Sequence, residues 1–252
     1  ARLLARELET RGTVIHIARD DKRMEAMRAA LAVLAPTATV LDFPAWDCLP
    51  YDRISPNPDI VARRMATLPA LAGGAMPGPF ILLTTLNAGM QRIPARSVLR
   101  EASFHARVGQ RVDEGHLRAF LARMGFSPVS TVAEPGDYAI RGGIVDLYPP
   151  GRGGPIRLDF FGDQLDGARR FDPITQRTVE KLSEVAFAPM SEVLLDPPSI
   201  TRFRQTYRAE FGTAGSDDPL YEAVSAGRKH QGMEHWLPLF HGGLDTLLTY
   251  TP

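Results

Sequence analysis

Cysteine is almost absent from this chain of 252 residues, because Cys48 is the only one. A single cysteine excludes an intramolecular disulfide and a zinc site built from cysteines. The sequence also identifies no base beside Cys48 that would make it a nucleophile. This composition fits a reducing compartment, and we therefore expect a cytoplasmic protein.

Net charge and long apolar runs are lacking as well. Lys+Arg and Asp+Glu number 29 each, so the chain has no overall basic field that would attract nucleic acid. Proline and glycine interrupt the longest apolar run, residues 68–83, before it reaches membrane-spanning length. Neither a signal peptide nor an initiator methionine opens the chain, and we interpret it as a trimmed fragment of a longer protein without a membrane partner.

Catalytic motifs are missing from the sequence. The phosphate-binding patterns GxxxxGK[ST] and GxGxxG, the zinc pattern HExxH and the nucleophile pattern GxSxG do not occur. Asp47, Asp52 and Asp59 match no metal loop in their spacing, so turn and capping roles are favoured for them. We predict no catalytic, cofactor-binding or metal-binding residue, although a phosphate loop could precede residue 1.

Residues 1–101 have the alternating pattern of strands and helices that is typical of an α/β domain. Asp20 is placed to cap a helix that ends before Pro36, and Asp59 to cap a later one. Strands separated by helices imply a parallel sheet with right-handed crossovers. The fold is therefore of the nucleotide-binding type, without a visible phosphate loop. The predicted strands are residues 13–18, 39–43 and 79–84.

Residues 102–195 change to the pattern of a small α+β domain. A helix follows the expected cap Asp113 and stops at Gly125, and strands are predicted at residues 129–132 and 137–148. Gly142 and Gly143 inside a strand indicate either a bulge or a close approach of another backbone.

The last segment, residues 196–252, is predicted to return to the first sheet. Residues 196–198 (Asp-Pro-Pro) are interpreted as a linker, followed by a helix with Phe203, Tyr207 and Phe211 in one stripe. Residues 244–250 are predicted to form a strand at the edge of that sheet. The first domain would then be discontinuous and interrupted by the middle one.

The strand predicted at residues 155–161 has an unusual outer face. Its residues alternate, so Arg157 and Phe161 lie opposite a buried face of Ile156, Leu158 and Phe160. Arginine and large aromatics together are enriched in binding hot spots, although a single exposed phenylalanine is also common. If neighbouring strands pair, Arg141 lies near Arg157 and Phe161, and the three exposed residues form one patch.

Three stretches together resemble a known family, the bacterial transcription-repair coupling factor. Residues 43–68 (FPAWDCLPYDRISPNPDIVARRMATL) are similar to its FPxWExLPYDxxSPxxDIxxxRxxTL motif. Residues 136–149 (GDYAIRGGIVDLYP) resemble GEYAxRGxxLDLFP, and residues 157–172 (RLDFFGDQLDGARRFD) resemble RLDFFDDEIDSLRxFD. With residues 232–240, the resemblance covers nearly the whole chain.

The resemblance implies an N-terminal module homologous to UvrB. Its fold would be a degenerate helicase-like α/β domain, related to P-loop NTPases, with an inserted small α+β domain that binds UvrA. The UvrA contacts of the family would fall on Arg141, Arg157 and Phe161. The module would have no catalysis of its own, because the motor that uses ATP and Mg²⁺ lies elsewhere in the full-length translocase. RNA polymerase and DNA would bind other domains, and a C-terminal domain would mask the UvrA surface.

Two other functions remain open. A UvrB-like ATP-dependent helicase or damage-binding fragment would need a phosphate loop, and its aromatic DNA-inserting hairpin does not fit the short stretch after Pro50 and Tyr51. A DNA-contacting surface built from arginines is disfavoured by the zero net charge.

Overall fold

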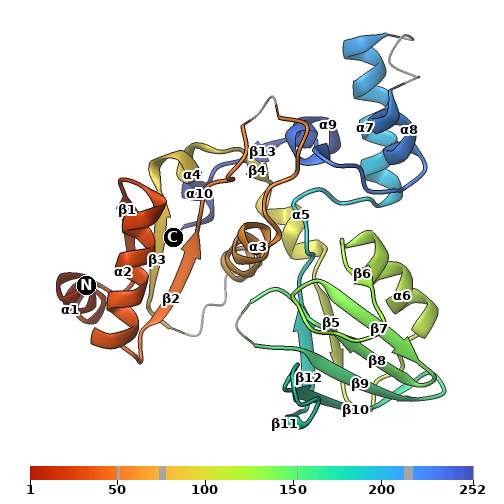
Figure 1. The fold of residues 1–252 in the computed structure, drawn as a ribbon, viewed down its shortest axis with the longest axis horizontal. Helices are drawn as coiled ribbons and strands as arrows, with labels where there is room; N and C mark the ends of the chain where they lie inside the picture. The colour runs from red at the N-terminus through yellow and green to blue at the C-terminus, as the bar shows by residue number, and fades with distance from the viewer. Residues whose placement is uncertain (50–51, 74–77, 152, 213–217, 252) are drawn as a thin grey trace.

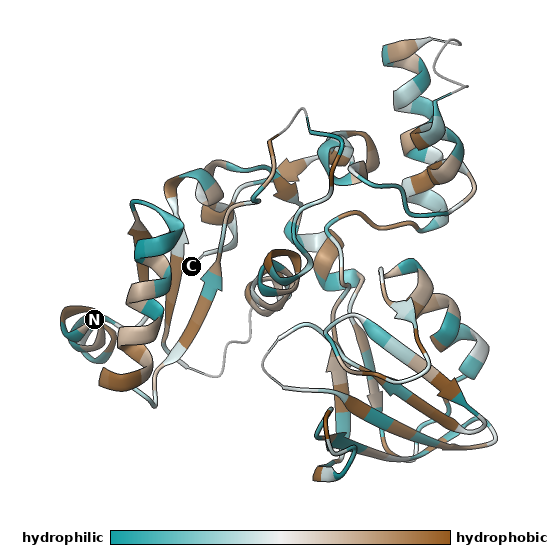
Figure 2. Cartoon of the chain, in the orientation of Figure 1, coloured by the Kyte–Doolittle hydropathy of each residue, from teal (hydrophilic) through white to brown (hydrophobic). Residues whose placement is uncertain are grey.

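A parallel sheet of three strands organises the first part of the chain. The computed structural model describes residues 1–49, 52–73, 78–151, 153–212 and 218–251. The strands run in the order β1-β3-β2 (Figure 1), and β3 is buried along its length and largely apolar (Figure 2). The predicted α/β layer with a parallel sheet is thus confirmed. The strands are β1 (Val14–Ala18), β2 (Thr39–Phe43) and β3 (Phe80–Thr85).

Helices cover both faces of this sheet. α1 (Arg2–Arg11) and α2 (Asp21–Leu34) pack on one face, and α3 (Pro58–Ala72) packs on the other. Asp20 caps α2 as predicted, because its side chain accepts a hydrogen bond from the Arg23 amide at 2.8 Å. The cap predicted at Asp59 is wrong. Asn57 fills that position and accepts from the Asp59 amide at 2.9 Å, which leaves Pro58 at the first helical position that proline favours.

The end of the chain lies against the first layer, but not as the predicted strand. β13 (Leu244–Asp245) pairs with β4 (Ile93–Pro94), outside the parallel sheet, and α10 (Leu247–Tyr250) follows it. Leu247 and Tyr250 are buried in the same core as β2, β3 and α3. These two residues share one face at a spacing of three, which suits a helix and not a strand. Along the chain, β3 is followed by α4 (Leu86–Met90), β4 and α5 (Arg96–Glu101), and then by the strands of the middle part.

The middle of the chain forms a six-stranded, mostly antiparallel sheet in the order β11-β10-β9-β8-β7-β6. Asp113 caps α6 (Glu114–Arg123) as predicted, accepting from the His116 amide at 2.6 Å. The strand predicted around residues 129–132 lies earlier and is shorter: β6 (Ser127–Pro128) pairs with β7, and the Val129 amide donates one more hydrogen bond to the Tyr138 carbonyl oxygen at 2.9 Å. The remaining strands are β7 (Asp137–Arg141), β8 (Ile144–Leu147), β9 (Ile156–Phe161), β10 (Gln164–Phe171) and β11 (Thr178–Leu182), with β5 (Phe104–Arg107) and β12 (Glu184–Phe187) as a separate pair.

The single strand predicted at residues 137–148 is a hairpin of β7 and β8. Gly142 turns the chain with φ +59°, a value that favours glycine. At Gly143 a Cβ atom would lie 2.5 Å from the carbonyl oxygen of Phe160. Of the two explanations for the glycine pair, the close backbone approach is therefore confirmed, and the bulge is not.

Residues 196–212 and 218–240 contribute to a separate helical core. The predicted linker at residues 196–198 is wrong, because Asp196 caps α7 (Pro197–Phe211) and accepts from the Ser199 amide at 2.8 Å. Phe203 and Tyr207 are buried in this core as their helical spacing predicts. The other helices are α8 (Pro219–Ser225), the 3-10 helix η2 (Met233–Trp236) and α9 (Leu237–Phe240).

Helix α3 connects the first layer to the middle sheet. Met65 and Leu68 belong to the core of the parallel layer, whereas Ala62 belongs to the core of the middle sheet. The domain limits 1–101, 102–195 and 196–252 stay a prediction, and they fall at the end of α5 and at the N-cap of α7. Over the ranges described, none of the helices has the length and apolar composition of a membrane span.

Candidate functional site

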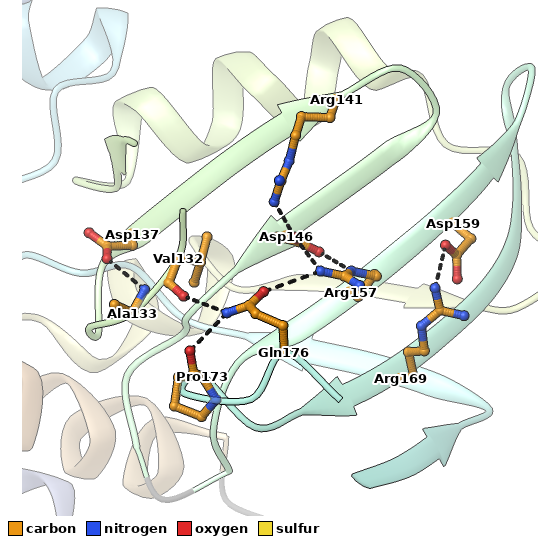
Figure 3. A network of polar contacts seen from close by, with 10 residues as sticks. All are labelled: Val132, Ala133, Asp137, Arg141, Asp146, Arg157, Asp159, Arg169, Pro173 and Gln176. Atoms are coloured by element: carbon orange, nitrogen blue, oxygen red, sulfur yellow. Dashed lines mark hydrogen bonds and ion pairs between the residues drawn. The ribbon is translucent and has the colours of Figure 1, made fainter. Parts of the chain in front are cut away.

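A buried carboxylate, Asp146, lies at the centre of one face of the middle sheet. Its strand β8 runs between β7 and β9, where Asp146 is in register with Ala139 and Arg157. A buried charge is costly unless it is paired. Arg157 supplies Nε at 2.6 Å and Nη2 at 2.8 Å, and Arg141 supplies Nη2 at 3.0 Å (Figure 3). One carboxylate therefore orients two guanidinium groups.

Arg157 is held on several sides. Its Nη2 also donates to Gln176 Oε1 at 3.4 Å, and its guanidinium lies 4.9 Å from the centre of the Phe171 ring. Gln176 has a positive φ of 58°, and its amide group donates to the carbonyl oxygens of Val132 and Pro173. The hydrogen bond to Asp146 is the main reason why the pKa of Arg157 lies above its usual value. Arg157 is thus charged and preorganised.

Phe161 and Arg141 present the accessible part of this face. Phe161 is 81% exposed and the Arg141 side chain 55%, whereas the Arg157 side chain is only 20% exposed. The alternation in β9 is confirmed, and Arg141 and Arg157 meet through Asp146. The sequence predicts that Arg157 is exposed like the other two residues, but it is only partly exposed because it pairs with the buried Asp146. Phe161 lies four residues beyond Arg157 on the strand, or about 13 Å away.

Three supporting residues escaped the sequence reasoning. The sequence predicts no site role for Asp146, Gln176 or Phe171, although it contains a signal for Asp146. An aspartate between apolar residues in Ile144–Leu147 is a charge in a buried strand, and such a residue is seldom buried without a partner. Gln176 and Phe171 carry no comparable signal, because a turn and a strand register bring them to Arg157. We call Arg141, Asp146, Arg157 and Phe161 the candidate face.

The aspartates of residues 44–57 serve the backbone. Asp47 accepts from the Asn57 amide and Asp52 from the Leu49 amide, each at 2.9 Å. The turn role is therefore confirmed for Asp52, whereas Asp47 bridges the loop to the N-cap residue of α3. Tyr51 and Pro50, part of the first family motif, lie outside the described residues. In the part of the chain that is described, no three His, Cys, Asp or Glu side chains are grouped to hold a metal ion.

Cys48 does acquire a histidine neighbour, which the sequence did not reveal. Its Sγ lies 3.7 Å from His235 Nε2, but the same nitrogen lies 3.0 Å from the Ile54 carbonyl oxygen. Burial and the charges of Asp47, Asp52 and Glu234 raise the pKa of the Cys48 thiol. A raised thiol pKa disfavours the thiolate, which is the nucleophilic form of cysteine.

Comparisons with known proteins identify relatives of this chain. Residues 104–192 match the family model of the UvrB interaction domain, which covers the candidate face. The chain is 37% identical to the transcription-repair-coupling factor of Haemophilus influenzae over 83% of its own length and 18% of the relative's. It is 36% identical to the factor of Escherichia coli, over 84% of this chain and 18% of the relative. It is 32% identical to the factor of Myxococcus xanthus, over 95% of this chain and 21% of the relative. The chain thus spans about a fifth of these curated relatives.

Proposed function

This chain is a relative of the bacterial transcription-repair-coupling factors with a UvrB interaction domain at its centre, and we propose that it recruits UvrA to a stalled RNA polymerase. The observation that carries the proposal is the candidate face. Arg141 and Arg157, oriented by Asp146, would donate charge-assisted hydrogen bonds, and Phe161 would be the apolar anchor. This role needs no catalytic residue.

The proposal is tested by titrating the purified chain with UvrA. Phe161→Ala should weaken binding about tenfold or more, because it removes an exposed aromatic anchor without opening a core. Val179→Ala is the matched control, since Val179 is 70% exposed on β11, two strands away from Phe161. Unchanged affinity in Phe161→Ala would refute this site.

Because Arg141 and Arg157 are charged, UvrA affinity should depend on salt concentration and on the identity of residue 157. Binding should weaken as salt rises, because exposed charges are screened. Arg157→Lys should lose affinity although the charge remains, since a lysine cannot make the forked contact with Asp146 that orients the guanidinium. An Arg157→Lys variant that binds UvrA as the wild type does would remove Arg157 from the site.

We further propose that the parallel layer is a degenerate helicase-like domain, related to P-loop NTPases, that does not hydrolyse ATP. At the carboxyl end of β1, where such folds often bind phosphate, the Asp20 carboxylate occupies the N-terminus of α2 and would repel a phosphate group. The UvrB-like helicase alternative requires nucleotide binding. A fluorescent ATP analogue should therefore show no saturable binding to the chain.

The roles of the whole factor extend this proposal. RNA polymerase and DNA would bind other domains, ATP and Mg²⁺ would serve the motor, and a C-terminal domain would mask the candidate face until the factor is engaged. The low cysteine content supports the cytoplasm as the compartment.

A further inference from the structure

The turn between β10 and β11 presents an apolar side chain that the candidate face does not include. Ile174 is 90% exposed, more than any other large apolar side chain among the described residues. A single exposed isoleucine is common on protein surfaces and needs no explanation by itself. The turn that holds Ile174 is less ordinary, because hydrogen bonds fix it and it borders Arg157.

Asp172 fixes this turn of residues 172–176. Its Oδ1 atom accepts hydrogen bonds from the Ile174 amide at 3.0 Å, the Thr175 amide at 2.6 Å and the Thr175 hydroxyl at 2.9 Å. The carbonyl oxygen of Asp172 accepts from the Gln176 amide at 2.7 Å. The hydrogen bond from the Thr175 amide is the main reason why the pKa of Asp172 lies below its usual value, so the acceptor is charged at neutral pH. Ile174 is therefore held on a backbone that has little conformational freedom left to lose when a partner binds.

Gln176 joins the turn to the candidate face. Its φ of 58° is uncommon for a residue other than glycine, and such a conformation persists where surrounding contacts hold it. Those contacts are made by its side chain, which donates to the carbonyl oxygens of Val132 and Pro173 and accepts from Arg157 (Figure 3). The turn and Arg157 thus form one continuous surface.

The strand register places the turn at the opposite end of the candidate face from Phe161. Strand β10 begins beside Phe161 and runs antiparallel to β9, past Arg157, before it reaches the turn. Arg157 therefore lies between two exposed apolar side chains, with Phe161 about 13 Å away along the strand and Ile174 beyond the other end. An interface of standard size covers about 800 Å² on each partner, or roughly 30 Å across, so one partner can contact both.

We propose, on the premise of the UvrA role above, that the turn of residues 172–176 is a second contact of the same surface and that Ile174 enters an apolar hollow of UvrA. Two apolar anchors would then flank the arginines. The complementary surface of UvrA would carry carboxylates opposite Arg141 and Arg157, with an apolar hollow on either side of them.

Titration of the whole chain with UvrA tests this contact. Ile174→Ala should weaken binding about fivefold or more, and Ile174→Asp should weaken it further, because a charge would enter an apolar hollow. Val33→Ala is the matched control, since Val33 is 79% exposed on α2 of the parallel layer, and it should bind as the wild type does. Ile174→Ala opens no core, so its melting temperature should equal that of the wild type.

Phe161→Ala in the same titration separates this contact from the proposed function. If Phe161→Ala loses affinity while Ile174→Ala binds as the wild type does, the UvrA role stands and the second contact is overturned. A wild type that does not bind UvrA would overturn both.

A double variant decides whether Ile174 contacts UvrA or acts through Arg157. A direct contact predicts that Ile174→Ala still weakens binding at least threefold when Arg157→Lys is already present. If the loss disappears in that background, the turn serves only to position Arg157, and the proposed contact is wrong.

Discussion

The orientation of both arginines in the candidate face depends on one carboxylate, that of Asp146. Asp146 is fully buried, and its two oxygens accept from both Arg141 and Arg157. The nearby pair of Asp159 and Arg169 has a similar length of 3.0 Å but is partly exposed. Water screens that second pair, so the two aspartates should differ strongly in their contributions to stability.

Asp146→Asn should destabilise the chain by about 2 kcal/mol, because the half-buried Arg157 loses a charged partner. It should also weaken UvrA binding, since both guanidinium groups lose their orientation. Urea unfolding measures the first effect and titration the second. Asp159→Asn is the control and should cost less than about 1 kcal/mol. Equal losses in the two variants would contradict the central role of Asp146.

The buried histidine His241 should make the stability of the chain depend on pH. Burial is the main reason why its pKa lies below 6.5, and only the weaker influences of Glu192 and Asp196 oppose this direction. The unfolded chain therefore takes up the proton first as pH falls below about 6.5, so stability present at neutral pH is lost toward lower pH. The melting temperature should fall less between pH 7.5 and 5.5 in His241→Gln than in the wild type. His16 shifts in the same direction but is common to both proteins. Parallel curves would exclude His241.

At the scale of elements, the β7–β8 hairpin positions the candidate face. Gly143 accepts a hydrogen bond from the Phe160 amide at 2.7 Å through its carbonyl oxygen, directly before Phe161. Arg141, two residues before Gly143, ends β7. The contact between the hairpin and β9 therefore sets the position of Arg141 relative to Phe161.

Gly143→Ala should destabilise the chain by about 2 kcal/mol, because the new Cβ atom would lie 2.5 Å from a backbone oxygen that cannot rotate away. UvrA affinity should fall as well. Gly243→Ala is the control, since a Cβ atom there meets nothing within 4 Å. Thermal unfolding compares the two variants, and equal melting temperatures would show that the hairpin adapts.

Across the whole molecule, a buried ion pair joins α3 to the segment after β12. Arg64 Nε lies 2.5 Å from Glu192 Oε1, and Arg64 Nη1 donates to the Pro44 carbonyl and to Gln91 Oε1, each at 2.8 Å. The guanidinium also lies 4.0 Å from the Phe43 ring centre. Because every partner is internal, we assign this pair to the junction between the layers and not to a binding site.

Glu192→Gln should cost about 3 kcal/mol, because it leaves the Arg64 charge buried without a counterion. The paired replacement Arg64→Met/Glu192→Leu should recover most of this loss, since it removes both charges and keeps the volume. Urea unfolding measures both effects. If the double variant is as unstable as Glu192→Gln, packing and not charge dominates the junction.

The sequence by itself determined the features that depend on neighbouring residues. Alternation places Arg157 and Phe161 on one face of β9, and the caps at Asp20 and Asp113 follow from local hydrogen bonds. Such features need only the backbone period and a few residues of chain.

The tertiary structure decided the features that join distant segments. It placed Asp146 between two arginines, lowered the exposure of Arg157, and paired Arg64 with Glu192 across 128 positions. It also divided residues 137–148 into a hairpin and ended the chain in a helix instead of a strand. Strand order and core packing determine these contacts, and local patterns do not contain that information because burial arises only when distant segments meet.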